Sequence, residues 1–415
     1  MHRRHAARLG LVVALVLATL AGCGPAPDDG SPLASSPLAE SPSSAVPSGP
    51  AGASPRPVPG TEVYGFLPYW EMDEGIAAHV AGTRLTTLAL FSVTHASSGA
   101  LNAGQRGYRA ITGEVGRRLI SEAHERGTRV EIVYTSFGIG RNRRFLEDLA
   151  LQDATIASLV ALAGEIGVDG VNVDIEALDP LLVPAYGAFV GRLREAVVAA
   201  DPGDEVSAAT GAGGVGATMA AAATAAGADR IFLMGYDYRT AGSSPGASAP
   251  LDRRDGDGKD LAWSLDLYAA LGVPAERTIL GLPLYGVTWP VAGPVVGAPE
   301  TGRGETWIPR RNLELLTDPD VAPVRDEVEQ VEVYLLGSDG SMGPPASEAT
   351  PPAGSAADVR WEAIYVDSPA TLAPKLALAR DRGLAGSGFW AIGYERGLPG
   401  YTDLIARFAA GDALD

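Results

Sequence analysis

Two acidic side chains lie two residues apart in an otherwise apolar segment, and this spacing could support acid–base chemistry. Residues 169–176 read Asp-Gly-Val-Asn-Val-Asp-Ile-Glu. Because alternate residues of a strand share a face, we expect Asn172, Asp174 and Glu176 to point together. Burying two carboxyls is costly without compensation, so one could serve as a proton donor and the other as a charge stabiliser. Helix capping or an ion-pair network is the alternative.

Polar and aromatic residues follow three other predicted strands. Tyr236 and Asp237 end one apolar run, Tyr285 and Trp289 follow the next, and Trp390 ends the last. A tyrosine hydroxyl donates a directed hydrogen bond, and flat aromatic rings suit the apolar faces of sugars. Any one of these aromatic residues could be ordinary core, but their recurrence at strand ends favours a carbohydrate-binding pocket.

The order of the predicted elements gives the fold. Short β-rich runs alternate with helical stretches from Val63 onward, which indicates parallel βα units. The predicted strands are 63–67, 86–93, 129–134, 171–174, 205–209, 230–236, 278–284 and 386–392. The predicted helices are 112–126, 153–166, 184–200, 218–226, 259–271 and 369–382. This alternation favours an α/β fold, a (β/α)8 barrel with its site at the C-terminal strand ends, over an open doubly wound sheet.

One segment interrupts the alternation between the seventh and eighth strands. Residues 291–360 contain the strand-like run 331–334, a second such run follows at 363–366, and a Pro/Gly/Ser-rich stretch at 337–356 divides the two. We predict a small α+β-like insertion beside the cleft. A long surface loop with two edge strands is the alternative.

Composition narrows the possible partners. Basic residues number 32 and acidic residues 50, for a net charge of −18, which argues against nucleic acid as a partner because phosphate binding needs a clustered positive surface. The 46% hydrophobic and 20% charged content is typical of a globular domain. No histidine spacing suits zinc. We therefore predict no metal and no cofactor, and we expect a monomer.

The N-terminus predicts export. Arg3, Arg4 and Arg8 precede an apolar run that is too short to span a bilayer, as in a signal peptide over 1–22. The run ends in Leu-Ala-Gly-Cys, which resembles the lipobox of bacterial lipoproteins, with Cys23 as the lipidated residue. Residues 23–60 have the composition of a flexible tether. We thus expect a lipid anchor on the outer face of the cell membrane and an extracellular domain over 61–412.

From about residue 61 to 410 the chain resembles glycoside hydrolase family 18, the chitinase and endo-N-acetylglucosaminidase family. The strand-four signature of that family is Asp-x-x-Asp-x-Asp-x-Glu, and its positions are occupied by Asp169, Asn172, Asp174 and Glu176. The other matching residues are Met234, Tyr236 and Asp237 on strand six, Trp390 on strand eight, Tyr64 on strand one and Tyr285 on strand seven. The Tyr-Gly-x-x-Trp detail, which ends at Trp289, looks most like the branch of bacterial spore-cortex glycosidases.

The resemblance implies retaining hydrolysis of β-1,4 bonds at N-acetylglucosamine, with the 2-acetamido group of the substrate as nucleophile. Glu176 would be the acid and base, while Asp174 and Tyr236 would hold the acetamido group. The same resemblance implies substrate contacts for Asn172, Asp237, Met234, Trp390, Tyr285, Trp289 and Tyr64. Chitin, chito-oligosaccharides, peptidoglycan and N-glycan cores all remain open as substrates.

Position 172 departs from the pattern, because many family members carry Asp there. An asparagine can still hydrogen-bond Asp174 but cannot share a proton with it. We expect activity to survive with a different pH range. The alternatives are a non-catalytic, glycan-binding cell-envelope protein and a barrel that contacts only a protein partner.

Overall fold

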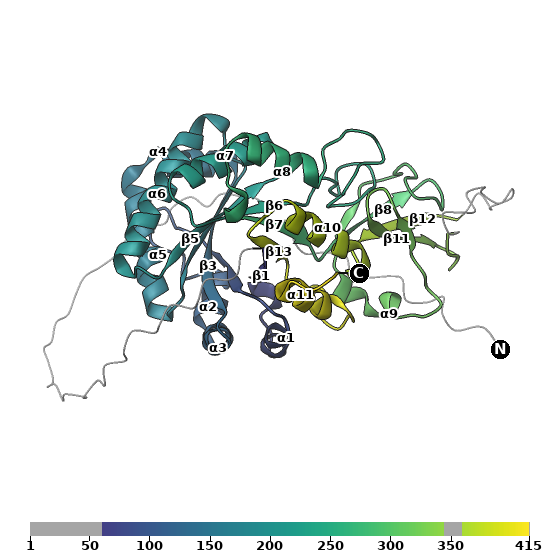
Figure 1. The fold of residues 1–415 in the computed structure, drawn as a ribbon, viewed down its shortest axis with the longest axis horizontal. Coiled ribbons are helices and arrows are strands. Elements are labelled where there is room, and N and C mark those ends of the chain that lie inside the picture. The colour runs from purple at the N-terminus through teal and green to yellow at the C-terminus, as the bar shows by residue number, and fades with distance from the viewer. Residues whose placement is uncertain (1–59, 344–358, 415) are drawn as a thin grey trace, which may run out of the picture. The chain divides into compact units, whose positions relative to one another are not determined.

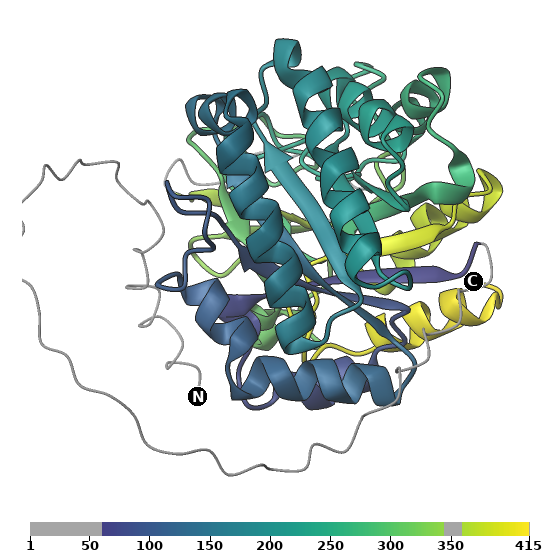
Figure 2. The ribbon, with the colours of Figure 1, turned by 90° about the vertical axis from the view of Figure 1, so that its left-hand side faces the viewer.

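The computed structural model describes residues 60–343 and 359–414, and every structural statement below concerns that part of the chain. The predicted signal peptide, Cys23 and nearly all of the predicted tether lie outside it. A closed barrel of parallel strands carries helices on its outside, and a separate small sheet lies beside the barrel (Figures 1 and 2).

The barrel strands follow one another in the order β1-β13-β7-β6-β5-β4-β3-β2. They are β1 (Glu62–Pro68), β2 (Thr87–Val93), β3 (Arg129–Phe137), β4 (Gly170–Glu176), β5 (Glu205–Gly211), β6 (Arg230–Met234), β7 (Thr278–Pro283) and β13 (Gly386–Trp390). The predicted (β/α)8 barrel is confirmed, since every predicted strand overlaps an observed one. β6 ends at Met234, so Tyr236 belongs to the loop that follows the strand and not to the strand itself.

The helices cover the outside of the barrel (Figure 2). They are α1 (Ile76–Gly82), α2 (Arg106–Thr112), α3 (Glu114–Glu125), α4 (Ile139–Glu147), α5 (Leu149–Ile166), α6 (Val183–Ala200), α7 (Gly214–Ala225), α8 (Leu261–Ala270), α10 (Pro369–Asp381) and α11 (Tyr401–Ala410). Asp148, Asp260 and Ser368 cap α5, α8 and α10 by accepting hydrogen bonds from backbone N–H groups. The predicted helix 112–126 corresponds to α3, and α2, which ends at Thr112, was not predicted.

The inside of the barrel is packed below the cleft. Inward-facing residues such as Phe66, Val133 and Phe232 form a cluster of their own. Gly281 and Gly388 make room for the Phe232 ring, because a Cβ atom at these positions would lie 2.3 Å and 2.5 Å from its carbons. The strands therefore leave open space only where their C-terminal ends diverge, as is usual in this architecture.

The insertion is an antiparallel sheet with the strand order β10-β11-β12-β8-β9. Its strands are β8 (Gly286–Val291), β9 (Glu305–Trp307), β10 (Val324–Asp326), β11 (Val331–Gly337) and β12 (Trp361–Val366), and α9 (Leu313–Leu316) lies among them. The predicted α+β-like insertion is confirmed, and the alternative of a surface loop with two edge strands is wrong. The sheet begins at Gly286 and not at the predicted residue 291, because β8 follows β7 almost directly.

The insertion holds the loop that follows β6. Trp289 of β8 donates a hydrogen bond from Nε1 to the carbonyl of Ser243 at 2.9 Å, and Glu329 accepts one from the backbone N–H of Ala247 at 2.6 Å. Arg254, in the same loop, pairs with Asp326 of β10. These contacts position the residues between β6 and α8, which include Tyr236 and Asp237.

Candidate active site

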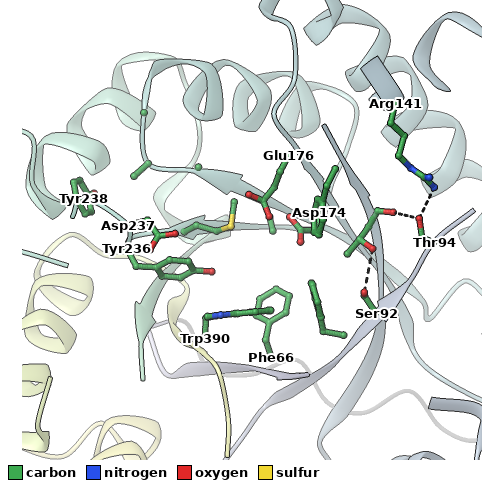
Figure 3. Close-up of a pocket in the computed structure, with 18 of the residues that line it drawn as sticks. Phe66, Ser92, Thr94, Arg141, Asp174, Glu176, Tyr236, Asp237, Tyr238 and Trp390 are labelled. Atoms are coloured by element: carbon green, nitrogen blue, oxygen red, sulfur yellow. Dashed lines mark hydrogen bonds between the residues drawn. The ribbon is translucent and has the colours of Figure 1, made fainter. Parts of the chain in front are cut away.

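A cleft of about 1100 Å³ opens at the C-terminal ends of the barrel strands. Seven of the eight barrel strands contribute to its lining, through Phe66, Phe91, Thr135, Asp174, Ala209, Met234 and Trp390. The two acids of β4 project into its centre, between Arg141 on one side and Tyr236 with Asp237 on the other (Figure 3).

The end of β4 sets the two acids at different depths. Asp174 is 4% exposed, whereas Glu176 is the exposed last residue of the strand. Ala177 follows in the left-handed region at φ 56°, an uncommon conformation for a residue with a Cβ atom. The chain therefore leaves the strand abruptly after Glu176, and that side chain remains at the mouth of the barrel above Asp174.

Burial favours the protonated forms of both acids. It raises the pKa of Asp174 well above the ordinary value, and the nearby charge of Glu176 adds to the effect. Burial also raises the pKa of Glu176, with a further contribution from the charge of Asp237. Two adjacent carboxyls in a poorly solvated site resist simultaneous ionisation, so the arrangement favours a pair that retains a proton.

The loop after β6 brings a hydroxyl and a third carboxyl to the cleft. The Tyr236 hydroxyl is turned toward the space between the acids and Trp390 (Figure 3). Burial, reinforced by Asp174, raises its pKa well above the ordinary value, so it remains a hydrogen-bond donor. Asp237 adopts the left-handed conformation at φ 62°, and its carboxylate accepts a hydrogen bond from the Tyr285 hydroxyl.

Aromatic rings form the wall below the acids. The ring of Trp390 lies 4.7 Å from that of Phe91 and 5.7 Å from that of Phe66, measured between centroids. Trp70 stands 6.4 Å from Trp390 and is 41% exposed. A partly exposed indole supported from below offers a flat apolar face to a ligand.

The structure brings together most of the residues that the sequence predicts for the site. Asp174, Glu176, Met234, Tyr236, Asp237 and Trp390 all line the cleft. Asn172 lies below Asp174 on the same face of β4 and is completely buried.

Four predicted substrate contacts do not line the cleft, which corrects that part of the prediction: the buried Asn172 described above, Tyr64, Trp289 and Tyr285. Tyr64 is 2% exposed, and its hydroxyl donates to Oε2 of Glu131 at 2.6 Å. Trp289 is fully buried in the insertion, and Tyr285, 6% exposed, reaches the cleft only through Asp237. Strand alternation gives the face on which a residue lies but not its depth along the barrel, so Tyr64 was assigned to the correct face at the wrong level.

Asp169, the first residue of the strand-four motif, lies at the opposite end of the barrel from the acids. It accepts hydrogen bonds from Nε2 of His124 at 2.8 Å and from the backbone N–H of Val130 at 2.6 Å. Although burial opposes ionisation, these bonds hold the pKa of Asp169 below the ordinary value. Its carboxylate therefore joins β3, β4 and α3 and takes no part in the cleft.

Several lining residues were not predicted from the sequence. Phe137 and Trp70 follow predicted strands, so a search for aromatic residues after every predicted strand could have found them. Arg141 and Lys259 also line the cleft, but they come from a helix and a loop that carry no recognisable motif. Within residues 60–343 and 359–414, no group of three or more His, Cys, Asp or Glu side chains is arranged to hold a metal ion.

The geometry suits proton transfer to a ligand held against an aromatic wall. Glu176 offers a protonated carboxyl at the opening, Asp174 a second carboxyl below it, and Tyr236 a hydroxyl donor beside both. Such a constellation can protonate a leaving oxygen and stabilise positive charge on the remaining fragment.

Comparison with known protein families and curated proteins identifies relatives of this chain. The family described as glycosyl hydrolases family 18 matches residues 132–395. Among curated proteins, YdhD of Bacillus subtilis (strain 168), named as a candidate sporulation-specific glycosylase, is 27% identical over 135 residues, which cover 30% of this chain and 28% of that protein. The chain thus matches less than a third of that relative's length.

Solved structures share the fold. A glycoside hydrolase family 18 N-acetylglucosaminidase from Paenibacillus barengoltzii aligns with a TM-score of 0.65 at 19% identity, covering 85% of this chain and 99% of that one. The spore cortex-lytic enzyme SleL from Bacillus cereus aligns with a TM-score of 0.63 at 18% identity, covering 85% and 74%. At these identities the likeness concerns the fold.

The site generates a first prediction. Asp237→Asn removes a charge that raises the pKa of Glu176, so this pKa should fall by about 0.5 to 1 unit. A 13C-carboxyl NMR titration of glutamate-labelled protein measures the change. Asp257→Asn is the control, because Asp257 also lines the cleft but pairs with Lys259 at 3.3 Å. Equal Glu176 titrations in both variants would contradict the electrostatic assignment.

Proposed function

Because this chain belongs to glycosyl hydrolase family 18 and is a glycosidase of that family, we propose that it hydrolyses β-1,4 bonds beside N-acetylglucosamine with the substrate's own acetamido group as nucleophile. The observation that carries the proposal is the stacking of Glu176, open to the cleft, above the buried Asp174. Tyr236 beside the pair and Trp390 below it complete a pocket for one sugar ring.

In the first step Glu176 gives its proton to the glycosidic oxygen, and the bond from that oxygen to the anomeric carbon breaks. The acetamido carbonyl oxygen attacks the same carbon and forms a cationic oxazolinium ring. Asp174, as a carboxylate, accepts a hydrogen bond from the acetamido N–H and stabilises the positive charge, while Tyr236 donates to the acetamido oxygen. A raised pKa keeps Glu176 protonated and ready for this step.

In the second step the ionised Glu176 removes a proton from water. The resulting hydroxide attacks the anomeric carbon and opens the oxazolinium ring, and Glu176 is protonated again. Two displacements at one carbon give net retention of configuration. The wall formed by Trp390 and Phe66 excludes bulk water from the lower side of the sugar, which protects the cation between the steps.

The guanidinium of Arg141, which the sequence analysis did not identify, favours a particular class of glycan. Arg141 donates from Nε to Ser136 and from Nη2 to Thr94 and to the carbonyl of His95, and it lines the cleft. Arg253 and Lys259, which also line the cleft, both pair with aspartates, whereas the described residues offer Arg141 no carboxylate within salt-bridge distance. A fixed guanidinium without an acidic partner suits a substrate that carries a carboxylate, as a muramic acid residue of peptidoglycan does.

The chief alternative is a glycan-binding protein without turnover. It would use the same aromatic wall and would not need Glu176. The retention of both carboxyls with raised pKa values favours the enzyme, and the first test below separates the two functions.

We also propose that the protein is exported and held at the outer face of the membrane through lipidated Cys23. The support is the Leu-Ala-Gly-Cys sequence at the end of an apolar run.

Glu176→Gln should lower kcat on an aryl chitobioside or chitotrioside about a thousandfold, because the amide cannot donate the proton, while binding of the uncleaved glycan is kept. Rates and isothermal titration calorimetry on the two proteins measure this. Tyr238→Phe, a change at a cleft-lining residue outside the proposed chemistry, is the control. Binding without turnover in the unaltered protein would support the glycan-binding alternative.

Arg141→Gln should reduce kcat/KM about tenfold on a muramic-acid-containing tetrasaccharide and leave the rate on neutral chitotetraose nearly unchanged. The comparison requires both substrates at matched chain length. Equal losses on both would mean that Arg141 only supports the fold of the β2 and β3 ends.

Cys23→Ser should move the protein from the membrane fraction of the producing cell to the soluble fraction and abolish labelling by an alkyne-tagged fatty acid. Persistent labelling in that variant would refute the assignment of the anchor.

A further inference from the structure

A buried carboxyl lies beneath the proposed catalytic pair. Glu131 is the third residue of β3, is 2% exposed and lies on the same inward face as Val133. Its Oε2 accepts hydrogen bonds from the Tyr64 hydroxyl at 2.6 Å and from Oγ of Ser207 at 2.5 Å. Glu131 has no place in the proposed chemistry, although burying a carboxyl is as costly here as it is at Asp174.

Ser207 connects Glu131 to Asn172. Nδ2 of Asn172 donates to Oγ of Ser207 at 2.7 Å. A serine hydroxyl has one proton, and Ser207 gives that proton to Glu131, so toward Asn172 it can only accept. The amide therefore has its NH2 group toward Ser207, and its Oδ1 is left buried without a donor.

Asn172 in turn lies next to Asp174 on the same face of β4. Oδ1 of Asp174 is also buried without a partner. A carbonyl oxygen beside a carboxylate is repulsive, but beside a protonated carboxyl it can accept a hydrogen bond. This orientation of the amide therefore favours protonated Asp174.

We propose that Glu131 is a positioning residue that sets the orientation of the Asn172 amide through Ser207, and thereby the protonation state of Asp174. When Glu131 is ionised, Ser207 donates to it, the Asn172 carbonyl faces Asp174, and Asp174 holds a proton. When Glu131 is protonated, it donates to Ser207, Ser207 donates to Oδ1 of the reversed amide, and the NH2 group stabilises ionised Asp174.

The surroundings of Glu131 let it compete with Asp174 for one proton. Burial raises the pKa of Glu131 to about 7, with Glu205 of β5 adding to the rise and with Ser207, Tyr64 and Arg129 opposing it. The residue across from it on β2 is the uncharged Ala89. Asp174 is faced by Glu176, Tyr236 and the Tyr186 hydroxyl of α6.

The link between Glu131 and Asp174 affects the reaction, and this effect rests on the proposed function. Asp174 must be ionised to stabilise the oxazolinium ring. Glu131 permits this state when it holds the proton that the two carboxyls share, and opposes it when Asp174 holds that proton; the partition of one proton between the two sites does not itself change with pH. Asn172 replaces the usual aspartate beside Asp174 and cannot share a proton with it. The proton is instead shared between Asp174 and Glu131, which are separated by the Asn172 amide and the Ser207 hydroxyl.

The most direct test needs no substrate. Asp174→Asn imitates protonated Asp174, because its amide can donate to Oδ1 of Asn172. It should therefore lower the pKa of Glu131 by about one unit, measured by 13C-carboxyl NMR titration of glutamate-labelled full-length protein. Glu332→Gln, at a carboxyl of the insertion, is the control and should leave the Glu131 titration unchanged.

Ser207→Ala completes a double-mutant cycle. It removes the relay, so Asp174→Asn should no longer move the Glu131 titration in that background. An unchanged Glu131 titration after Asp174→Asn alone would overturn the proposal. A shift of equal size with and without Ser207 would also overturn it, because the two carboxyls would then interact through space.

Activity gives a second readout. Glu131→Gln keeps the size of the side chain but cannot carry the charge that leaves the shared proton on Asp174, so kcat/KM at neutral pH should rise severalfold on a neutral chito-oligosaccharide. An unchanged kcat/KM would contradict the link to Asp174. If no glycan is cleaved by any of the proteins, the proposed function fails, while the titrations still decide the role of Glu131.

Discussion

The chemistry of the cleft depends on carboxyl groups that are buried inside the closed barrel. The inward face of β4 carries Asn172, Asp174 and Glu176 where a packed barrel would have apolar side chains. Burial makes ionisation of Asp174 difficult and places the two acids under each other's influence. That constraint produces a carboxyl that stays protonated at the mouth of the barrel and one below it whose charge depends on its neighbours.

The residues around the acids act at two depths. Tyr236, Asp237, Trp390 and Met234 line the cleft itself. Below them, side-chain hydrogen bonds fix the positions of other residues. Tyr285 donates to Asp237, and Asn172 donates to Ser207. The insertion belongs to this support, since the buried Trp289 fixes the loop that carries Tyr236. Its sheet thus contributes by restraining a loop, although it supplies no residue to the cleft lining.

The sequence predicts the barrel well because strand alternation and strand order are local properties. The spacing of Asp174 and Glu176 was enough to place both at one strand end. Depth was less accessible: Tyr64 and Trp289 have the expected residue type, but only packing decides that Tyr64 lies beneath the cleft and that Trp289 is buried in the insertion. Glu131 could have been found, because it interrupts an apolar run in β3 as Asp174 does in β4. The short strands β9 and β10 have three residues each, too few for a recognisable alternation, and they depend on pairing with β8 and β11.

The central claim is that the carbonyl oxygen of the substrate's acetamido group attacks the anomeric carbon. Successive fluorination of the N-acetyl methyl group weakens this oxygen as a nucleophile and leaves the leaving group unchanged. The most direct measurement is therefore kcat/KM for aryl chitobiosides with the N-acetyl, N-fluoroacetyl, N-difluoroacetyl and N-trifluoroacetyl groups. The account predicts a steep and monotonic fall across the series. A flat series would contradict it, because the nucleophile would then belong to the protein or to water.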